Sequence, residues 1–257
     1  MSLEKIFRAF GQAMGEAMSE NGKFEFRMGD FKFHDEDEGE SLAALDLGGE
    51  APEVLKVALG RHDVVKVKKG KELAITLDGE EADTSIRFVR KEDALKIFRR
   101  RGTSGDAAEI TVTMPAPRKI AIGGAGTVEA KTLAENGELA IGGSGTIRVE
   151  KLKGRILRAR IGGSGRIEAA GKVGELDLSI GGSGKLAAPD LEADIAHIRI
   201  GGSGKAELSS GGEVSAKIGG VGDILVHGSP RCSLKAGGAG RIRCVPRGGE
   251  EPPAEAA

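Results

Sequence analysis

The chain has 257 residues, a formal net charge of −1, no tryptophan, no tyrosine and only eight phenylalanines. The near-zero net charge gives no strong general attraction to nucleic acid, and the scarcity of aromatic rings argues against the stacking of bases or sugars. No apolar run is long enough to cross a membrane as a helix. The 42 glycines are many for a globular chain, and much of this excess lies in one repeated motif.

The first segment, residues 1–41, is predicted to begin with an amphipathic helix. Ser2 fits the N-cap position and Asn21-Gly22 ends the pattern. We expect this helix to cap an open end of the fold or to mediate self-association, and attachment to a membrane surface is the alternative. Its apolar residues recur at helical spacing, at Leu3, Ile6, Phe7, Phe10, Met14, Ala17 and Met18.

The same segment lacks the continuous apolar centre and the small-residue cleavage site of an export signal. We therefore expect a cytoplasmic protein, with the cell envelope or surface as the alternative. Apolar residues alternate around Gly29-Asp30 between Phe24 and Phe33, which predicts a small hairpin. The acidic run at residues 35–40 has no regular cation-ligand spacing and is expected to be a solvated linker.

Residues 42–117 alternate like strands but have no fixed period, and we expect them to form the first, irregular coils of a larger stack. Asp78-Gly79 and the glycine at Gly70 signal turns. Arg99–Gly105 is predicted to be a basic surface loop, which either contacts an anion or is simply mobile. The predicted strands are Leu42–Leu47, Val54–Leu59, Val64–Lys68, Leu73–Leu77, Ser85–Arg90, Ala94–Phe98 and Glu109–Met114.

From residue 118 to residue 246 one motif recurs seven times, as in Ile-Gly-Gly-Ser-Gly-Thr-Ile at 141–147. The first glycines of successive copies are 18 to 20 residues apart, a period typical of solenoids. Apolar and polar residues alternate on both sides of the glycines, which predicts strand, tight turn and strand in each coil. Two aliphatic ladders would face inward: Ile120, Leu139, Ala159, Leu178, Ile198, Ala216 and Leu234 before the turn, and Val128, Ile147, Ile167, Leu186, Ala206, Ile224 and Ile242 after it.

A single coil of this length cannot bury its own apolar side, whereas stacked coils bury it together. We therefore predict an all-β protein, a single-stranded parallel β-helix with coils of about 19 residues and a short N-terminal amphipathic helix. The general handedness of parallel crossovers makes a right-handed coil the expectation. The solenoid would span residues 42–246, irregular over 42–117 and regular over 118–246, and residues 247–257 would form a disordered tail rich in Pro, Gly and Glu.

The recurring Gly-Ser-Gly followed by an aliphatic strand, after a preamble of alternating strands, resembles the auto-transporter adhesin "head GIN" domain family of the DUF2807 type. The resemblance covers roughly residues 42–246. It implies a β-helical fold, and family members are commonly exported. The family often has Asp after the second glycine of Gly-Ser-Gly. Here only Asp223 matches, and the other copies have Thr127, Thr146, Arg166, Lys185, Lys205 and Arg241.

No metal, cofactor or catalytic site is predicted, and no sequence-specific binding of nucleic acid. The calcium-binding nonapeptide repeat needs Asp where this repeat has core aliphatic residues. No Ser/His/Asp or Cys/His grouping can be defined, and the acids form no convergent pair. The histidines His34, His62, His197 and His227 share no ligand spacing.

Outward positions of the repeat carry charge. Glu129, Arg148 and Glu168 are predicted to stack as an alternating ladder on neighbouring coils. Two basic stripes would flank the glycine turn and are the candidate site for an anionic polymer or lipid surface, although simple solvation of the strand faces is the preferred interpretation. The stripes consist of Arg160, Arg199, Lys217 and Lys235 before the turn, and Arg166, Lys185, Lys205 and Arg241 after it.

Cys232 and Cys244 lie in the last coil, and Cys244 falls on an inward position. A buried, reduced thiol is therefore expected there, and a disulfide would require an oxidising compartment.

We expect a non-enzymatic, adhesin-like or scaffolding solenoid that presents a repetitive face to a partner protein, to an anionic surface or to copies of itself. A carbohydrate-active β-helix enzyme is the alternative of a different class, because β-helices host such enzymes. A self-assembling scaffold resembling bactofilin filaments is the other alternative.

Overall fold

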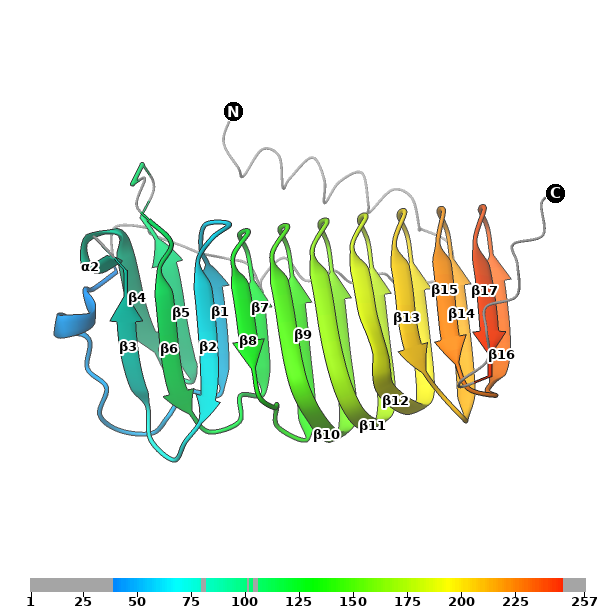
Figure 1. Ribbon diagram of the computed structural model, residues 1–257, viewed down its shortest axis with the longest axis horizontal. Coiled ribbons are helices and arrows are strands. Elements are labelled where there is room, and N and C mark those ends of the chain that lie inside the picture. Colours follow the sequence, from blue (N-terminus) through cyan, green and yellow to red (C-terminus); the bar gives the residue numbers. More distant parts are fainter. Residues whose placement is uncertain (1–38, 80–81, 101, 104–105, 247–257) are drawn as a thin grey trace. The chain divides into compact units, whose positions relative to one another are not determined.

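Figure 1 shows the computed structural model, which describes residues 39–79, 82–100, 102–103 and 106–246. The predicted N-terminal helix, the hairpin, most of the acidic linker and the C-terminal tail lie outside these residues. The strands are β1 (Val54–Ala58), β2 (Val64–Lys69), β3 (Ala74–Asp78), β4 (Ile86–Lys91), β5 (Ala94–Arg99), β6 (Glu109–Met114), β7 (Lys119–Ile122), β8 (Thr127–Ala130), β9 (Asn136–Ile141), β10 (Thr146–Ile161), β11 (Arg166–Ile180), β12 (Lys185–Ile200), β13 (Lys205–Ser209), β14 (Glu213–Ile218), β15 (Asp223–His227), β16 (Arg231–Ala236) and β17 (Arg241–Val245). Two short helices accompany them, η2 (Leu42–Ala44) and α2 (Ala82–Ser85).

The strands stack in two rows, and each coil contributes one strand to each row (Figure 1). The first row contains β5, β1, β7 and β9, the second halves of β10, β11 and β12, then β14 and β16, all parallel. The second row contains β6, β2 and β8, the first halves of β10, β11 and β12, then β13, β15 and β17. The predicted parallel β-solenoid with coils of about 19 residues is therefore confirmed.

The register places both predicted aliphatic ladders inside the solenoid. Ile120 pairs with Leu139, and Leu139 with Ala159, and all three are 0 % exposed. On the other row Val128 pairs with Ile147 and Ile147 with Ile167, again all 0 % exposed. Each inward residue thus packs on its equivalents one coil before and one coil after, which buries apolar surface that a single coil would leave in water.

The second glycine of each turn is required because neighbouring coils approach closely there. Ser164 donates its backbone N–H to the carbonyl oxygen of Gly143 at 3.1 Å, which brings the two turns together. A Cβ on Gly163 would lie 2.2 Å from that same carbonyl oxygen. Only glycine fits this contact, and this explains why the motif repeats with the coil.

The irregular coils differ from the sequence-based expectation in their order. Six of the seven predicted strands are present, and their ends differ from the predicted ends by at most one residue. The seventh, Leu42–Leu47, contains the short helix η2 instead of a strand. The coil of β1 and β2 lies between the coil of β5 and β6 and the coil of β7 and β8, so spatial order departs from chain order. Strands β3 and β4 are antiparallel to β6 and β5 and close this end of the stack.

The two ends of the solenoid differ in how well the chain covers them. At the end formed by β3 and β4, Ile86 and Phe88 are 0 % exposed. At the other end, Val214 and Ala216 in β14 are buried, whereas their partners Cys232 and Leu234 in β16 are exposed and half-buried respectively. The last coil therefore leaves its inward positions uncovered by the described residues.

Neither helix in the described part of the chain has the length and apolar character needed to cross a membrane.

Candidate functional site

The predicted basic stripes flank the row of glycine turns, but each stripe is interrupted. In the first row Arg160 pairs with Ser179, and Ser179 with Arg199, so a serine separates the two arginines. In the second row Lys205 pairs with Asp223, and Asp223 with Arg241. Between the stripes, the turns expose small residues such as Ser164 and Ser183.

Five of the eight stripe cations are neutralised by carboxylates on the same or neighbouring strands. The pairs are Arg160 with Glu138 at 2.5 Å, Arg199 with Asp177 at 2.7 Å, Arg166 with Glu168 at 3.9 Å, Lys185 with Glu207 at 3.8 Å and Arg241 with Asp223 at 3.9 Å. Only Lys205, Lys217 and Lys235 form no ion pair with the described residues. The stripes thus hold fewer free charges than the sequence alone indicates.

The predicted charge ladder is present. Arg148 donates from Nε to Glu168 at 2.8 Å and from Nη1 to Glu129 at 3.0 Å, so one guanidinium joins three coils. The hydrogen bonds from Arg148 to Glu168 and Glu129 raise the pKa of Arg148 above its ordinary value. The arginine is about half exposed, so we assign it a role in strand register rather than in ligand binding.

The irregular coils contain a buried ion pair that the sequence pattern does not predict. Arg99, expected on a surface loop, is 13 % exposed at its side chain and binds Asp63, which is 3 % exposed. The signal that could have found it is weak, because Asp63 belongs to an ordinary turn sequence and Arg99 to a run of three arginines. We assign this pair a structural role, since Asp63 and Arg99 connect the β1–β2 turn, the end of β5 and the segment before β6.

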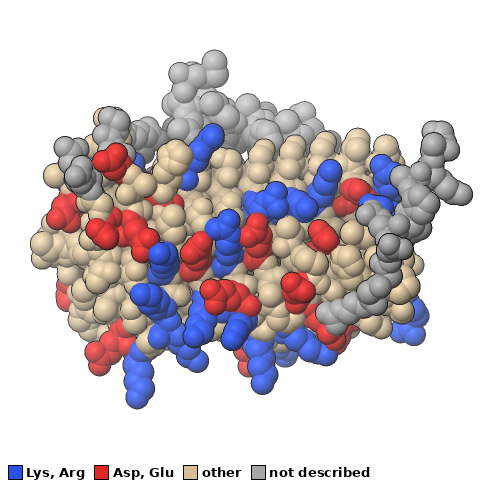
Figure 2. Space-filling view, viewed as in Figure 1, with Lys and Arg blue, Asp and Glu red and all other residues tan. Residues whose placement is uncertain are grey.

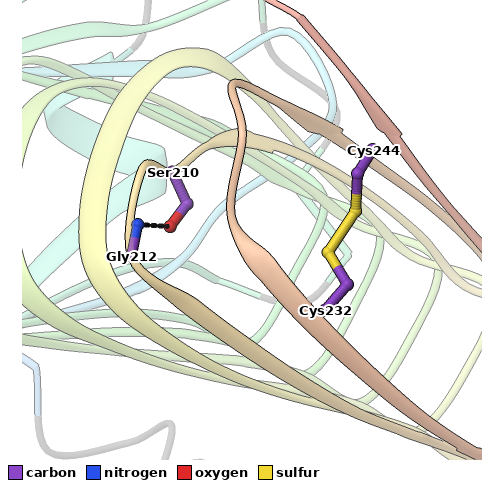
Figure 3. The surroundings of a disulfide bond; sticks show 4 residues. All are labelled: Ser210, Gly212, Cys232 and Cys244. Atoms are coloured by element: carbon purple, nitrogen blue, oxygen red, sulfur yellow. Dashed lines mark hydrogen bonds between the residues drawn. A yellow bond between two sulfur atoms is a disulfide. The ribbon is translucent and has the colours of Figure 1, made fainter.

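The expected reduced thiol at Cys244 is wrong. Figure 3 shows Cys232 and Cys244 joined by a disulfide, with Cα atoms 7.4 Å apart. Both cysteines occupy inward register positions, opposite Val214 and Val226, but no further coil of the described chain covers them and they are exposed. The bond therefore links the two rows at the open end of the stack, where packing alone is weakest.

The described residues contain no group of three or more His, Cys, Asp or Glu side chains placed to hold a metal ion. His62 precedes β2 and His197 lies within β12, so the two are on different coils. His227 lies 3.2 Å from Glu207 on the adjoining coil. This last contact belongs to the outward charge columns of the solenoid.

Comparison with known proteins agrees with this architecture. Residues 55–230 match the family model described as "Putative auto-transporter adhesin, head GIN domain". No curated protein matches the chain. The solved structures with similar folds include a putative adhesin from Bacteroides fragilis, with a TM-score of 0.67 and 21 % identity over 77 % of this chain and 94 % of that one.

Two further crystal structures come from Parabacteroides. One is a putative lipid binding protein from Parabacteroides distasonis, with a TM-score of 0.59 and 19 % identity over 76 % of this chain and 93 % of that one. The other is a putative adhesin from Parabacteroides merdae, with a TM-score of 0.55 and 18 % identity over 76 % and 92 %. At these identities the structures establish the shared fold. Because the family model covers more than half of the sequence, the chain belongs to the head GIN domain family of adhesin-like β-solenoids.

Proposed function

We propose that this protein is a non-catalytic, adhesin-like solenoid of the cell envelope that binds an anionic surface along its outer face. Family membership supports the adhesin-like role. The similar fold of a protein described as lipid binding supports a lipid surface as the binding partner. The outer face consists of regular columns of charged side chains fixed on a stack of coils. Such a face suits repeated weak contacts with an extended partner better than the enclosure of a small substrate.

The single observation that carries the envelope location is the Cys232–Cys244 disulfide. Disulfides form and persist in oxidising compartments and are rare in the cytosol. This favours the envelope over the cytoplasmic location expected from residues 1–20.

The test is to trap thiols in intact cells with an alkylating agent and to measure the oxidation state of both cysteines in the full-length native protein. External protease is added to a parallel sample of intact cells, and a cytoplasmic protein serves as the control for lysis. An oxidised pair in a protease-accessible chain is the expected result. Reduced cysteines in a chain that resists protease until lysis would contradict the envelope assignment.

The glycine-turn stripes are the alternative binding surface. Because most of their cations are already paired with carboxylates, we propose that they chiefly hold neighbouring coils in register. The triple variant Arg166→Glu, Lys185→Glu, Lys205→Glu is then expected to retain salt-sensitive binding to anionic vesicles. A loss of that binding in a correctly folded variant would return the ligand site to the stripes.

A further inference from the structure

A second set of cations lies where the chain bends back from the second row to the first, on the side of the solenoid opposite the glycine turns. Val67 pairs with Ala130, so Lys68 and Lys131, which follow them, lie on neighbouring coils. The backbone N–H of Lys151 donates to the carbonyl oxygen of Lys131 at 2.9 Å, which places Lys151 on the next coil. In Figure 2, Lys and Arg side chains project along the lower border of the molecule, with Asp and Glu side chains among them. We call this set the return-bend edge: Lys68, Lys69, Lys131, Lys151, Lys153 and Arg155.

Among the described residues, the return-bend edge carries an excess of positive charge. All six side chains are exposed, and none forms an ion pair with the described residues. Glu72, Glu135 and Glu150 are the carboxylates on the same bends, so the six cations outnumber three acids there. One coil further, Lys172 binds Glu192 at 3.2 Å and Asp194 at 3.3 Å. The free positive charge of this edge is therefore concentrated on the coils of β2, β8 and β10.

A shallow recess lies at the same place. It has a volume of about 160 Å³, counting the part open to solvent, and Lys68, Lys69 and Lys131 stand around it. Val67, Met114 and Pro117 contribute its apolar lining. The recess has no room for even a water molecule, so an anionic headgroup would contact the lysines at the surface and not inside it.

The residue types indicate which anionic surface fits. Five of the six cations are lysines, whose hydrated point charges suit diffuse attraction to phosphates better than the planar, two-pronged recognition that arginine provides. Sugar-binding faces commonly rely on aromatic stacking, and the chain has no tryptophan or tyrosine. We propose that the return-bend edge docks the solenoid on an anionic phospholipid surface, side-on, through Lys68, Lys69, Lys131, Lys151, Lys153 and Arg155.

This docking surface specifies the ligand of the proposed function and rests on that function. The test is sedimentation of the full-length protein with vesicles. One vesicle preparation is phosphatidylcholine alone and the other contains phosphatidylglycerol. The test variant is Lys68→Gln, Lys131→Gln, Lys151→Gln, Lys153→Gln. The matched control, Lys185→Gln, Lys205→Gln, Lys217→Gln, Lys235→Gln, removes the same number of positive charges beside the glycine turns. Circular dichroism confirms that both variants are folded.

Each lysine near an anionic surface contributes roughly fivefold in partitioning. We therefore expect the test variant to bind phosphatidylglycerol vesicles at least about tenfold more weakly than the native chain, while the control variant changes less than about threefold. An equal loss in both variants would mean that net charge alone drives binding and would overturn the proposal. Unchanged binding by the test variant would overturn it as well.

Two further measurements distinguish a phospholipid surface from a neutral lipid and from an anionic polysaccharide. Binding to phosphatidylcholine alone with equal strength would remove the electrostatic basis. Binding of soluble alginate in place of vesicles, lost in the same test variant, would assign the edge to an anionic polysaccharide and contradict the lipid. The cell experiments and the vesicle experiments are independent of each other. If the protein does not bind vesicles, the envelope assignment still stands. If the chain is intracellular and reduced but binds vesicles, only the envelope assignment is contradicted.

Discussion

Asp63 and Arg99 lie 36 residues apart in the chain and form a two-pronged ion pair, with Arg99 Nε 2.9 Å and Nη2 2.5 Å from the carboxylate oxygens. Asp63 also accepts the backbone N–H groups of Gly60 and Ala108, and Arg99 donates to the hydroxyl of Ser85. The pair therefore ties the β1–β2 turn to the end of β5 and to the segment before β6. These are the places where the irregular coils depart from chain order.

Asp63→Asn is expected to destabilise the fold strongly. The substitution leaves Arg99 buried without its counter-charge, which typically costs about 3–5 kcal/mol. Chemical unfolding at neutral pH measures the change. Asp78→Asn, at an exposed aspartate on β3, is the control and should alter the free energy of unfolding by less than about 0.5 kcal/mol. Similar effects of the two substitutions would mean that the Asp63–Arg99 pair contributes no special stability.

The same aspartate predicts a pH dependence. Burial by itself would raise the pKa of Asp63, but hydrogen bonds from Arg99, Ala108 and Gly60 outweigh it and hold the pKa below its ordinary value of 3.8. A depressed pKa in the folded state means that the stabilisation is complete above the unfolded-state pKa and is lost as pH falls through the folded value. Acid unfolding of the native chain should thus steepen below about pH 4, and Asp63→Asn should remove that part of the slope. Parallel acid titrations of native and variant chains would argue against it.

The outward charge columns predict different effects on stability for two charge reversals. Arg148→Glu places three carboxylates in one column, with Glu129 and Glu168, and should cost about 1 kcal/mol. Lys217→Glu places a carboxylate between Arg199 and Lys235 and should be neutral or slightly stabilising. Thermal unfolding at low and high salt measures both, and salt should shrink both effects because exposed charges are screened. Equal destabilisation by the two reversals would show that the columns do not interact as the register implies.

The glycine turns allow a sharp test of close packing between coils. Gly163→Ala directs a methyl group to within 2.2 Å of the carbonyl oxygen of Gly143, and backbone cannot move aside as a flexible side chain can. We expect a loss of about 3 kcal/mol or more, at the upper end of overpacking costs. Gly211→Ala is the control, because no atom beyond its chain neighbours lies within 4 Å of its Cβ position. Differential scanning calorimetry distinguishes the two, and comparable transitions would contradict the close stacking.

The structure can be predicted from the sequence where the repeat has a constant period, and less well where it has none. Between Ile120 and Ile224 the glycines fix where each turn falls, so the inward ladders follow directly from the spacing. Before residue 118 no fixed period exists. Strand positions there are still predictable from alternation, but which strand neighbours which depends on long-range contacts such as Asp63–Arg99, and these leave no periodic trace.

The candidate surface was harder to predict for a related reason. Counting from the glycines identified Arg160, Arg166 and their equivalents as outward residues, but it could not show that nearby carboxylates neutralise them. The return-bend edge is not predictable in the same way, because the register shifts between Val149 and Leu152. Residues on the bend therefore do not lie at a constant number of positions after the glycine turn. Cys244 was misjudged because an inward position is buried only if another coil covers it.

The disulfide therefore predicts a local effect at the open end of the stack. Cys232→Ser with Cys244→Ser removes a link between residues 12 apart in sequence, for which chain entropy gives a stabilisation of about 3 kcal/mol. Since coils contact only their neighbours, the loss should be concentrated in β16 and β17 and fade toward β12. Hydrogen exchange should show faster exchange of backbone amides in Arg231–Val245, with the amides of β10 unchanged. Reducing the native protein should reproduce the pattern, and it should have no further effect on the double variant. Uniform acceleration along all coils would mean that the bond stabilises the solenoid globally, whereas no acceleration would mean that the last coil is held by packing alone.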